Sequence, residues 1–134
     1  MGWWFNRGKT RAMARGVMLI GVGCVASASI AATPAPDANR KAYDYALRCY
    51  VAGAVAVGDK RINPDGTLTA SLKAGSKRAF DTAYGMGKIL GYAKQRVSSD
   101  LDAYSRVETI IMVRDDVYFQ KTRTDCAKLG LMQP

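Results

Sequence analysis

Apolar residues recur at helical spacing in three stretches of this chain, and the first stretch covers residues 40–57. After two basic residues, only Asp44 and Arg48 interrupt a segment that is otherwise almost continuously apolar. Its expected packing positions lie three or four residues apart, as on one face of a helix. They are Ala42, Ala46, Cys49, Gly53 and Val57. The pattern predicts a buried helix that is too short to be a membrane span.

The second stretch, residues 67–97, has a narrower apolar face, which predicts an amphipathic helix. The apolar residues of this face are Leu68, Leu72, Ala79, Ala83, Met86, Leu90, Ala93 and Val97. Gly85, Gly87 and Gly91 also lie in this stretch, and each destabilises a helix interior by about 1 kcal/mol relative to alanine. We therefore expect a bend or break within residues 85–91, where the glycines serve a close helix contact or a hinge.

Basic and aromatic side chains gather on the opposite face of this second stretch, because an advance of about 100° per residue points them in similar directions. The set is Lys73, Lys77, Tyr84, Lys88 and Tyr92, with Gln95 beside them. Such a basic stripe suits the phosphate or carboxylate groups of an envelope polymer, a lipid headgroup or a nucleic acid. A solvated helix face is the other interpretation of the same charges.

The third stretch, residues 100–129, predicts the longest helix. The segment at residues 98–100, Ser-Ser-Asp, offers a cap and an acidic first turn. At the rise of an α-helix this element would be about 45 Å long, so we expect it to be the spine of the fold. One face is formed by Leu101, Tyr104, Val107, Ile111, Tyr118, Thr122, Cys126 and Leu129.

Charged residues interrupt the middle of the third stretch at Arg114, Asp115 and Asp116. Asp115 falls close to the core-facing side of the predicted helix. A buried carboxylate is costly unless it is paired. We therefore expect Asp115 either to pair with Arg48 or Arg106, or to mark a local irregularity.

Residues 58–66, GDKRINPDG, separate the first two stretches with residues typical of a turn. A calcium loop is the competing interpretation, but its first and twelfth ligand positions would be Arg61 and Leu72. Because these two positions should carry carboxylates, we expect a plain turn.

The residues before the first helix have the order of a secretory signal peptide. Four basic residues and no acidic residue precede an apolar run at residues 17–26, and small residues follow up to Ala32. This order predicts a signal peptide over residues 1–32, cleaved after Ala31 or Ala32. One alternative is an uncleaved membrane anchor. Another is a lipid on Cys24, although Gly21 departs from the residue that a lipoprotein signal has at that place.

Removal of the signal peptide changes the charge and the cysteine count. Four of the 20 Lys and Arg and none of the 11 Asp and Glu lie in residues 1–32, so the formal net charge falls from +9 to +5. That excess favours anionic partners. Cys24 also leaves, and the remaining Cys49 and Cys126 indicate one disulfide in an oxidising compartment. Two buried free thiols are the alternative.

The chain carries no catalytic signature. It has no histidine, which is the commonest general base and metal ligand. Cys49 and Cys126 lack CxxC spacing, and the glycines of residues 85–91 have the spacing GxGxxxG in place of a dinucleotide-binding pattern. We therefore expect no enzyme activity, no metal and no cofactor.

These patterns predict an all-α protein built as a small bundle of three principal helices with one disulfide. The expected segments are a signal peptide at 1–32, a flexible N-terminal tail at 33–39, a helical domain at 40–130 and a C-terminal tail at 131–134. In size, export and single disulfide the chain is similar to acid-stress periplasmic chaperones, which is an analogy without matched residues. We expect a periplasmic or secreted interaction protein, with a binder of anionic surfaces as the alternative. The pattern leaves the oligomeric state open.

Overall fold

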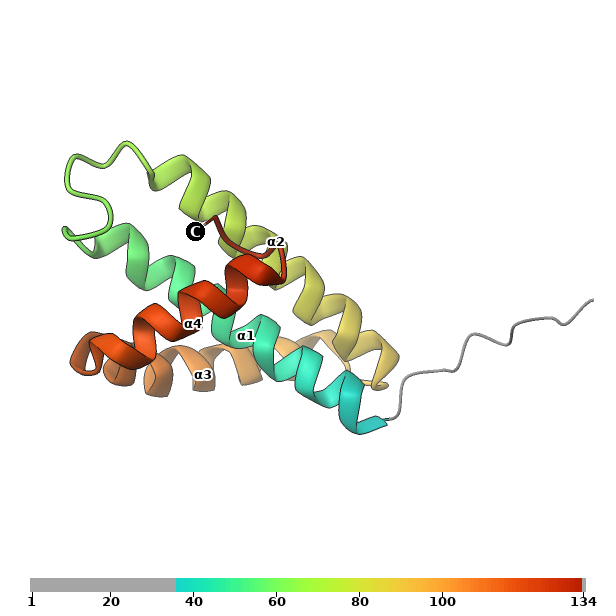
Figure 1. Cartoon of the computed structure of the whole chain (residues 1–134). Coiled ribbons are helices and arrows are strands. Elements are labelled where there is room, and N and C mark those ends of the chain that lie inside the picture. The colour runs from blue at the N-terminus through green and yellow to red at the C-terminus, as the bar shows by residue number, and fades with distance from the viewer. Residues whose placement is uncertain (1–35, 134) are drawn as a thin grey trace, which may run out of the picture. The chain divides into compact units, whose positions relative to one another are not determined.

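The computed structural model describes residues 36–133, whose helices are shown in Figure 1. Four helices and no strand occur in this part of the chain. The predicted all-α class is therefore confirmed. The predicted number of three principal helices is wrong, because the long third stretch divides in its middle.

The first helix, α1 (Pro36–Gly58), begins four residues before its predicted start. Proline suits the first turn of a helix, because its ring fixes φ and its missing N–H would have no partner there. Asp37 adds a favourable negative charge to the N-terminal end. Residues 36–39 therefore belong to the helix and not to the predicted flexible tail.

α1 is the central helix of the described domain, since it contacts each of the other three; Figure 1 shows α4 crossing it. Its buried residues are mostly small, which lets neighbouring helices approach closely. They are Tyr43, Ala46, Leu47, Cys49, Val51, Ala52, Gly53 and Ala56. The spine of the fold is thus α1, and not the long helix predicted for residues 100–129.

A turn at Gly91 separates α2 (Thr69–Ile89) from α3 (Lys94–Arg114). Gly91 has a φ of +75°, in the left-handed region that glycine adopts without strain. The break predicted within residues 85–91 is thus confirmed at its last residue. The cap predicted at residues 98–100 is wrong, because this segment lies inside α3.

Gly87 serves a close helix contact, as one of the two sequence interpretations expected. A Cβ atom at Gly87 would lie 2.7 Å from Cγ2 of Val97 and 3.4 Å from the ring of Tyr43. Gly85 also lies within α2, but a Cβ atom there would meet no atom within 4 Å. The glycines therefore differ in role, and Gly87 is the one that lets α2 pack against its neighbours.

A single non-helical residue, Asp115, separates α3 from α4 (Asp116–Lys128). Its carboxylate accepts a hydrogen bond of 2.9 Å from the backbone N–H of Tyr118, so Asp115 is the N-cap of α4. Asp115 is exposed and is not the buried partner of Arg48 or Arg106. Of the two expectations for Asp115, the local irregularity is confirmed.

The disulfide between Cys49 of α1 and Cys126 of α4 is formed, with the two Cα atoms 5.6 Å apart. Both cysteines are buried. The cluster around them contains Val51, Ala52, Ala56, Leu72, Ala79, Met112, Phe119 and Met132. A second cluster, nearer the start of α1, contains Tyr43, Ala46, Leu47, Ala83 and Val97.

The predicted C-terminal tail packs onto the core. Met132 is buried, and the Leu131 N–H donates a hydrogen bond of 3.0 Å to the carbonyl oxygen of Cys126. The carbonyl oxygen of Leu131 would lie 2.9 Å from a Cβ atom at Gly75. The chain after α4 therefore fits closely against α2.

Residues 1–35 and 134 lie outside the described residues. The signal peptide, the membrane anchor, the lipid on Cys24 and residues 33–35 of the N-terminal tail therefore stay predictions. Within residues 36–133, no helix has the length and hydropathy that a membrane crossing needs.

Candidate interaction surfaces

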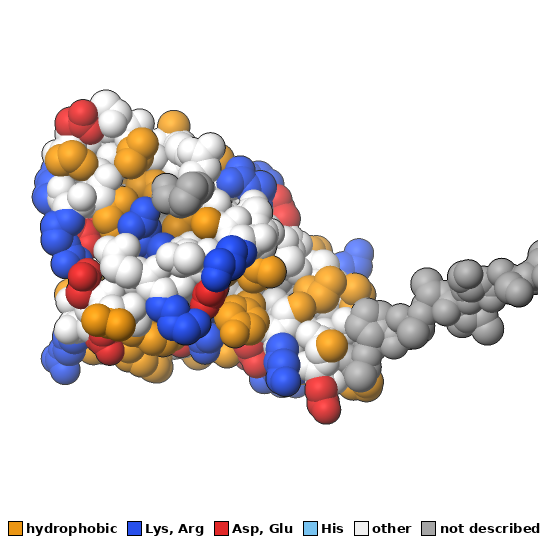
Figure 2. All heavy atoms as spheres, viewed as in Figure 1, with side chains coloured by type: hydrophobic (Ala, Val, Ile, Leu, Met, Phe, Trp, Pro, Cys, Tyr) orange, Lys and Arg blue, Asp and Glu red, His pale blue; other side chains and the backbone are white. Residues whose placement is uncertain are grey.

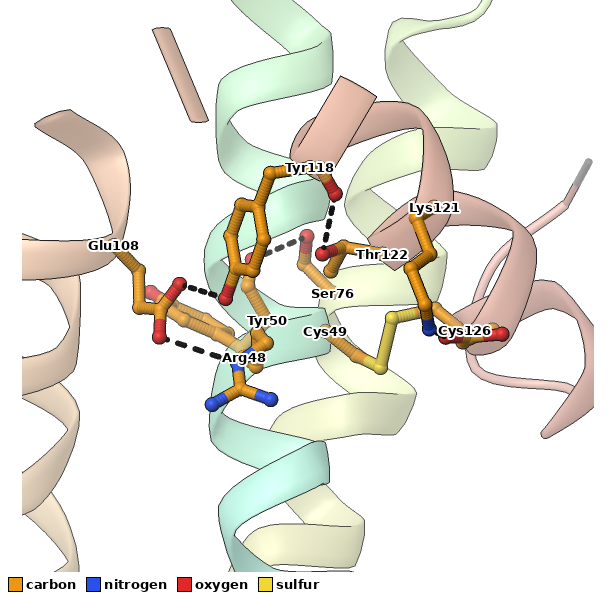
Figure 3. Close-up of a disulfide and its surroundings, with 10 residues drawn as sticks. Arg48, Cys49, Tyr50, Ser76, Glu108, Tyr118, Lys121, Thr122 and Cys126 are labelled. Carbon is orange, nitrogen blue, oxygen red and sulfur yellow. Dashed lines mark hydrogen bonds and ion pairs between the residues drawn. A yellow bond between two sulfur atoms is a disulfide. The ribbon is translucent and has the colours of Figure 1, made fainter. Parts of the chain in front are cut away.

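The buried carboxylate of the fold belongs to Glu108, the only glutamate of the chain. Its Oε1 lies 3.1 Å from Nε of Arg48, and its Oε2 accepts a hydrogen bond of 2.6 Å from the Tyr118 hydroxyl. Figure 3 shows the three side chains meeting from α3, α1 and α4 beside the disulfide. Each carboxylate oxygen accepts a hydrogen bond from another helix, so Glu108 joins α3 to α1 and α4. Glu108 is thus the buried carboxylate paired with Arg48 that the sequence suggested at Asp115.

Burial raises the pKa of Tyr118 to about 12, and its hydrogen bond to Glu108 acts in the same direction. Burial, followed by a hydrogen bond to Asp100, likewise raises the pKa of Tyr43. Both hydroxyl groups thus stay protonated at neutral pH and serve as hydrogen-bond donors. These shifts have structural causes and do not indicate acid–base catalysis.

Tyr92, one of the predicted anion-binding residues, lies apart from the basic stripe. It follows α2 in the turn at Gly91, and its ring lies 4.1 Å from the guanidinium carbon of Arg96. Its hydroxyl lies 2.6 Å from Nη1 of Arg40. Arg40 and Arg96 each have a carboxylate partner within 4 Å as well, so this cluster ties α1 to α3 with little charge left over.

The other four predicted anion-binding residues lie on α2, but the structure divides them into two pairs. Lys88 is 6.0 Å from the ring centroid of Tyr84. Lys73 and Lys77 lie at the other end of α2, and Lys77 and Lys88 are 11 positions apart, which corresponds to about 16 Å along the helix. The basic stripe is therefore not one compact site.

Lys73 and Lys77 line a groove between α1 and α2 with a volume of about 510 Å³. The remaining lining residues of this α1–α2 groove are Tyr50, Ala54, Val57, Ser76 and Phe80. No pattern in the sequence connects Tyr50 and Phe80 with the lysines. The spacing of 30 residues between the two rings gave no local signal, because only the packing of α1 on α2 brings them together.

A second surface is apolar and lies where α3 ends and α4 begins. We call it the α3 apolar face; its residues are Val107, Ile110, Ile111, Val113 and Val117. These five side chains are between 39% and 81% exposed. Figure 2 shows apolar side chains along the lower edge of the described domain, over this junction. α3 is therefore apolar on two sides, of which one meets the core and the other meets solvent.

The apolar pattern of the sequence predicts Val107 and Ile111 on the core side, but both are exposed in the structure. The buried line of the last two helices passes through Met112 and Phe119, one position away from the expected Ile111 and Tyr118. Residues 110–113 are all apolar, so their periodicity cannot indicate which of them faces inward. The contact with α1 decides it.

Two hollows flank the α3 apolar face. One, of about 260 Å³, is lined by Ala103, Tyr104, Val107 and Glu108. The other, of about 460 Å³, lies between the end of α1 and α3 and has Val113 in its wall. Arg106 and Arg114 are exposed next to the face, and neither belongs to any of the ion pairs formed within residues 36–133. The surface thus combines an apolar ridge, two recesses and unpaired positive charge.

No group of His, Cys, Asp or Glu side chains within residues 36–133 is arranged to hold a metal ion. Comparison with protein-family models, curated proteins and solved structures gives no match. The case for a function therefore depends on the two surfaces themselves.

Proposed function

We propose that this chain is an exported interaction protein without enzymatic activity, and that it binds a partner protein through the α3 apolar face. The observation that carries this proposal is the exposure of five Val and Ile side chains around the junction of α3 and α4, four of them on α3, whose other side is already buried. Contiguous apolar patches on a small domain mark interaction sites more often than single exposed residues do.

The charges beside the ridge favour an acidic amphipathic helix as the partner. Arg106 and Arg114 lie one turn before and one turn after Ile110. If a second copy packed antiparallel about a two-fold axis at Ile110, Arg106 would oppose Arg114 of the other copy. Like charges at that place disfavour the dimer, whereas Asp or Glu residues flanking an apolar stripe would pair with both arginines.

The size of the α3 apolar face limits the affinity for a partner protein. Full burial of an exposed Val or Ile contributes about 1.5–3 kcal/mol, so five partly exposed side chains contribute on the order of 10 kcal/mol at most. Association itself costs about 4–15 kcal/mol. The apolar face alone therefore gives modest affinity, and the arginines and the two hollows must supply the specificity.

Site-specific crosslinking tests this function in the organism that makes the protein. A photoreactive amino acid at Val113 should give a crosslinked product, whereas the same group at Gln95, exposed elsewhere on α3, should give none. Reversal of both flanking charges, by Arg106→Glu with Arg114→Glu, should remove the product. Equal crosslinking from both positions, or no effect of charge reversal, would contradict the proposal, and a product of two copies of this chain would assign the face to self-association.

The protein would act as a chaperone if the α3 apolar face bound many different unfolded chains in place of one partner. Purified protein should then suppress aggregation of an unrelated client, and Ile110→Asp should abolish the suppression. A partner-specific protein should leave client aggregation unchanged. This assay separates the two forms because only a chaperone binds sequences of no fixed charge pattern.

Export is part of the proposal, and two features support it. The buried disulfide is of a kind that persists in oxidising compartments, and residues 1–32 have the order of a signal peptide. The intact mass of the protein recovered from the envelope, with and without reductant and alkylation, should show removal of residues 1–31 or 1–32. A full-length mass would indicate a retained anchor, and a lipid mass on Cys24 would indicate a lipoprotein.

A further inference from the structure

The α1–α2 groove lies on elements other than the α3 apolar face and has a different chemistry. Its walls are the rings of Tyr50 and Phe80, whose centroids are 6.4 Å apart, together with Ala54 and Val57. The Ser76 hydroxyl is satisfied within the fold, because it donates to the carbonyl oxygen of Tyr50 at 3.3 Å. The lining of the groove is therefore mostly apolar, and its charged groups are the two lysines.

The close crossing of α1 and α2 holds this groove in place. A Cβ atom at Gly53 would lie 2.1 Å from the Ser76 Oγ, so the absence of a side chain at Gly53 makes room for the Ser76 side chain at the crossing. Tyr50 and Phe80 are partly buried next to this crossing. A groove bounded by two well-packed helices is preformed, and a ligand would not have to order its walls.

The lysines provide the equivalent of about one uncompensated positive charge. Lys77 Nζ lies 2.6 Å from Asp81 Oδ2, whereas Lys73 belongs to none of the ion pairs formed within residues 36–133. The two lysines are one helical turn, about 6 Å, apart on α2. A polyanion would need several free cations along its path, and the next lysine of the stripe, Lys88, is about 16 Å away.

We propose that the α1–α2 groove binds a small amphiphilic anion, with its acyl or aryl body lying against the rings of Tyr50 and Phe80 and its carboxylate or similar head group at Lys73 and Lys77. A volume of about 510 Å³ lies within the range of small-molecule sites. The aromatic rings contact the body of the ligand, and the lysines fix its orientation. This proposal is independent of the α3 apolar face.

Titration calorimetry and NMR with decanoate as the probe test the site in the oxidised protein. We expect decanoate to bind and to shift the resonances of Tyr50, Ser76 and Phe80. Lys73→Gln should weaken binding about two- to fivefold, as for other exposed charge pairs. Lys88→Gln is the matched control, with the same change on the same helix outside the groove, and it should leave decanoate binding unchanged.

Other ligands define the outcomes that would overturn the proposal. Decanol has the same body without charge and inorganic phosphate has charge without a body, so both should bind more weakly than decanoate. Equal binding of decanol would show a merely apolar patch. Equal weakening by Lys88→Gln, or preferential binding of polyphosphate or acidic vesicles, would show a diffuse anionic-surface binder, and shifts confined to the α3 apolar face would place the ligand elsewhere.

Discussion

The side chain of Glu108 on α3 contacts residues of two other helices. Its carboxylate bridges Arg48 and Tyr118 and so joins three helices. Glu108→Gln should lower the free energy of unfolding by about 1–3 kcal/mol, because the partly buried Arg48 loses its counter-ion. Urea unfolding followed by circular dichroism measures the change.

The matched control for Glu108 is Asp81→Asn, which removes a carboxylate from an exposed pair with Lys77. An exposed pair of this kind contributes less than about 1 kcal/mol. If both substitutions had the same small effect, the network around Glu108 would not be a structural junction.

Ionisation of Tyr118 should lower the stability of the fold at alkaline pH. Its pKa in the folded state, about 12, lies above the ordinary value of 10.0, so folding favours the protonated hydroxyl. The stabilisation is complete below pH 10 and is lost as the pH rises through about 12. Unfolding free energies measured across this range should therefore fall, and Tyr118→Phe should make the decline shallower; an unchanged decline would assign it to other tyrosines such as Tyr43.

At the scale of helices, the crossing of α1 and α2 depends on Gly53. Gly53→Ala would place its Cβ atom 2.1 Å from the Ser76 Oγ and should destabilise the protein by about 1–3 kcal/mol through overpacking. Thermal and urea unfolding test this expectation, and Gly53→Ala combined with Ser76→Ala should recover part of the loss.

Gly85→Ala is the control for Gly53→Ala, because Gly85 lies in α2 and a Cβ atom there would meet no atom within 4 Å. Alanine is favoured over glycine in a helix interior, so this substitution should stabilise the protein by about 0.5–1 kcal/mol. If Gly53→Ala were also stabilising, the close crossing would not hold in solution.

The break between α2 and α3 has a clear signal in the sequence, whereas the break between α3 and α4 has a weak one. The three glycines of residues 85–91 predicted a break because each weakens a helix interior, and the structure places the break at Gly91, whose φ of +75° glycine adopts without strain. The break at Asp115 was harder to place, since Arg114, Asp115 and Asp116 are compatible with an uninterrupted helix. Asp115 becomes an N-cap only because α4 must turn to bring Phe119 and Cys126 against α1.

At the scale of the whole domain, the disulfide between Cys49 and Cys126 closes a loop of 77 residues. In the chain-entropy model, a loop of this length stabilises the folded state by about 4–5 kcal/mol, a large share of a small domain's stability. Cys49→Ser with Cys126→Ser should lower the free energy of unfolding by about this amount. A loss below about 1 kcal/mol would contradict this expectation and would mean that residual structure already restricts the unfolded chain without the disulfide.

The sequence by itself predicted the helical class, a break within residues 85–91 and a disulfide between Cys49 and Cys126, with two free thiols as the alternative. The helical class follows from local periodicity, the break from glycines that weaken a helix interior, and the disulfide from the presence of only two cysteines outside residues 1–32. These inferences need no knowledge of which elements meet.

Only the tertiary structure decided which side of an apolar helix is left exposed and which distant residues share a surface. Ile110 and Met112 are both apolar, yet one meets solvent and the other the core, because α1 covers one side of α3 alone. Lys73 and Phe80 become neighbours of Tyr50 in the same way, through the crossing of α1 and α2. Both candidate interaction surfaces are therefore products of packing, which the spacing of residues along one chain cannot specify.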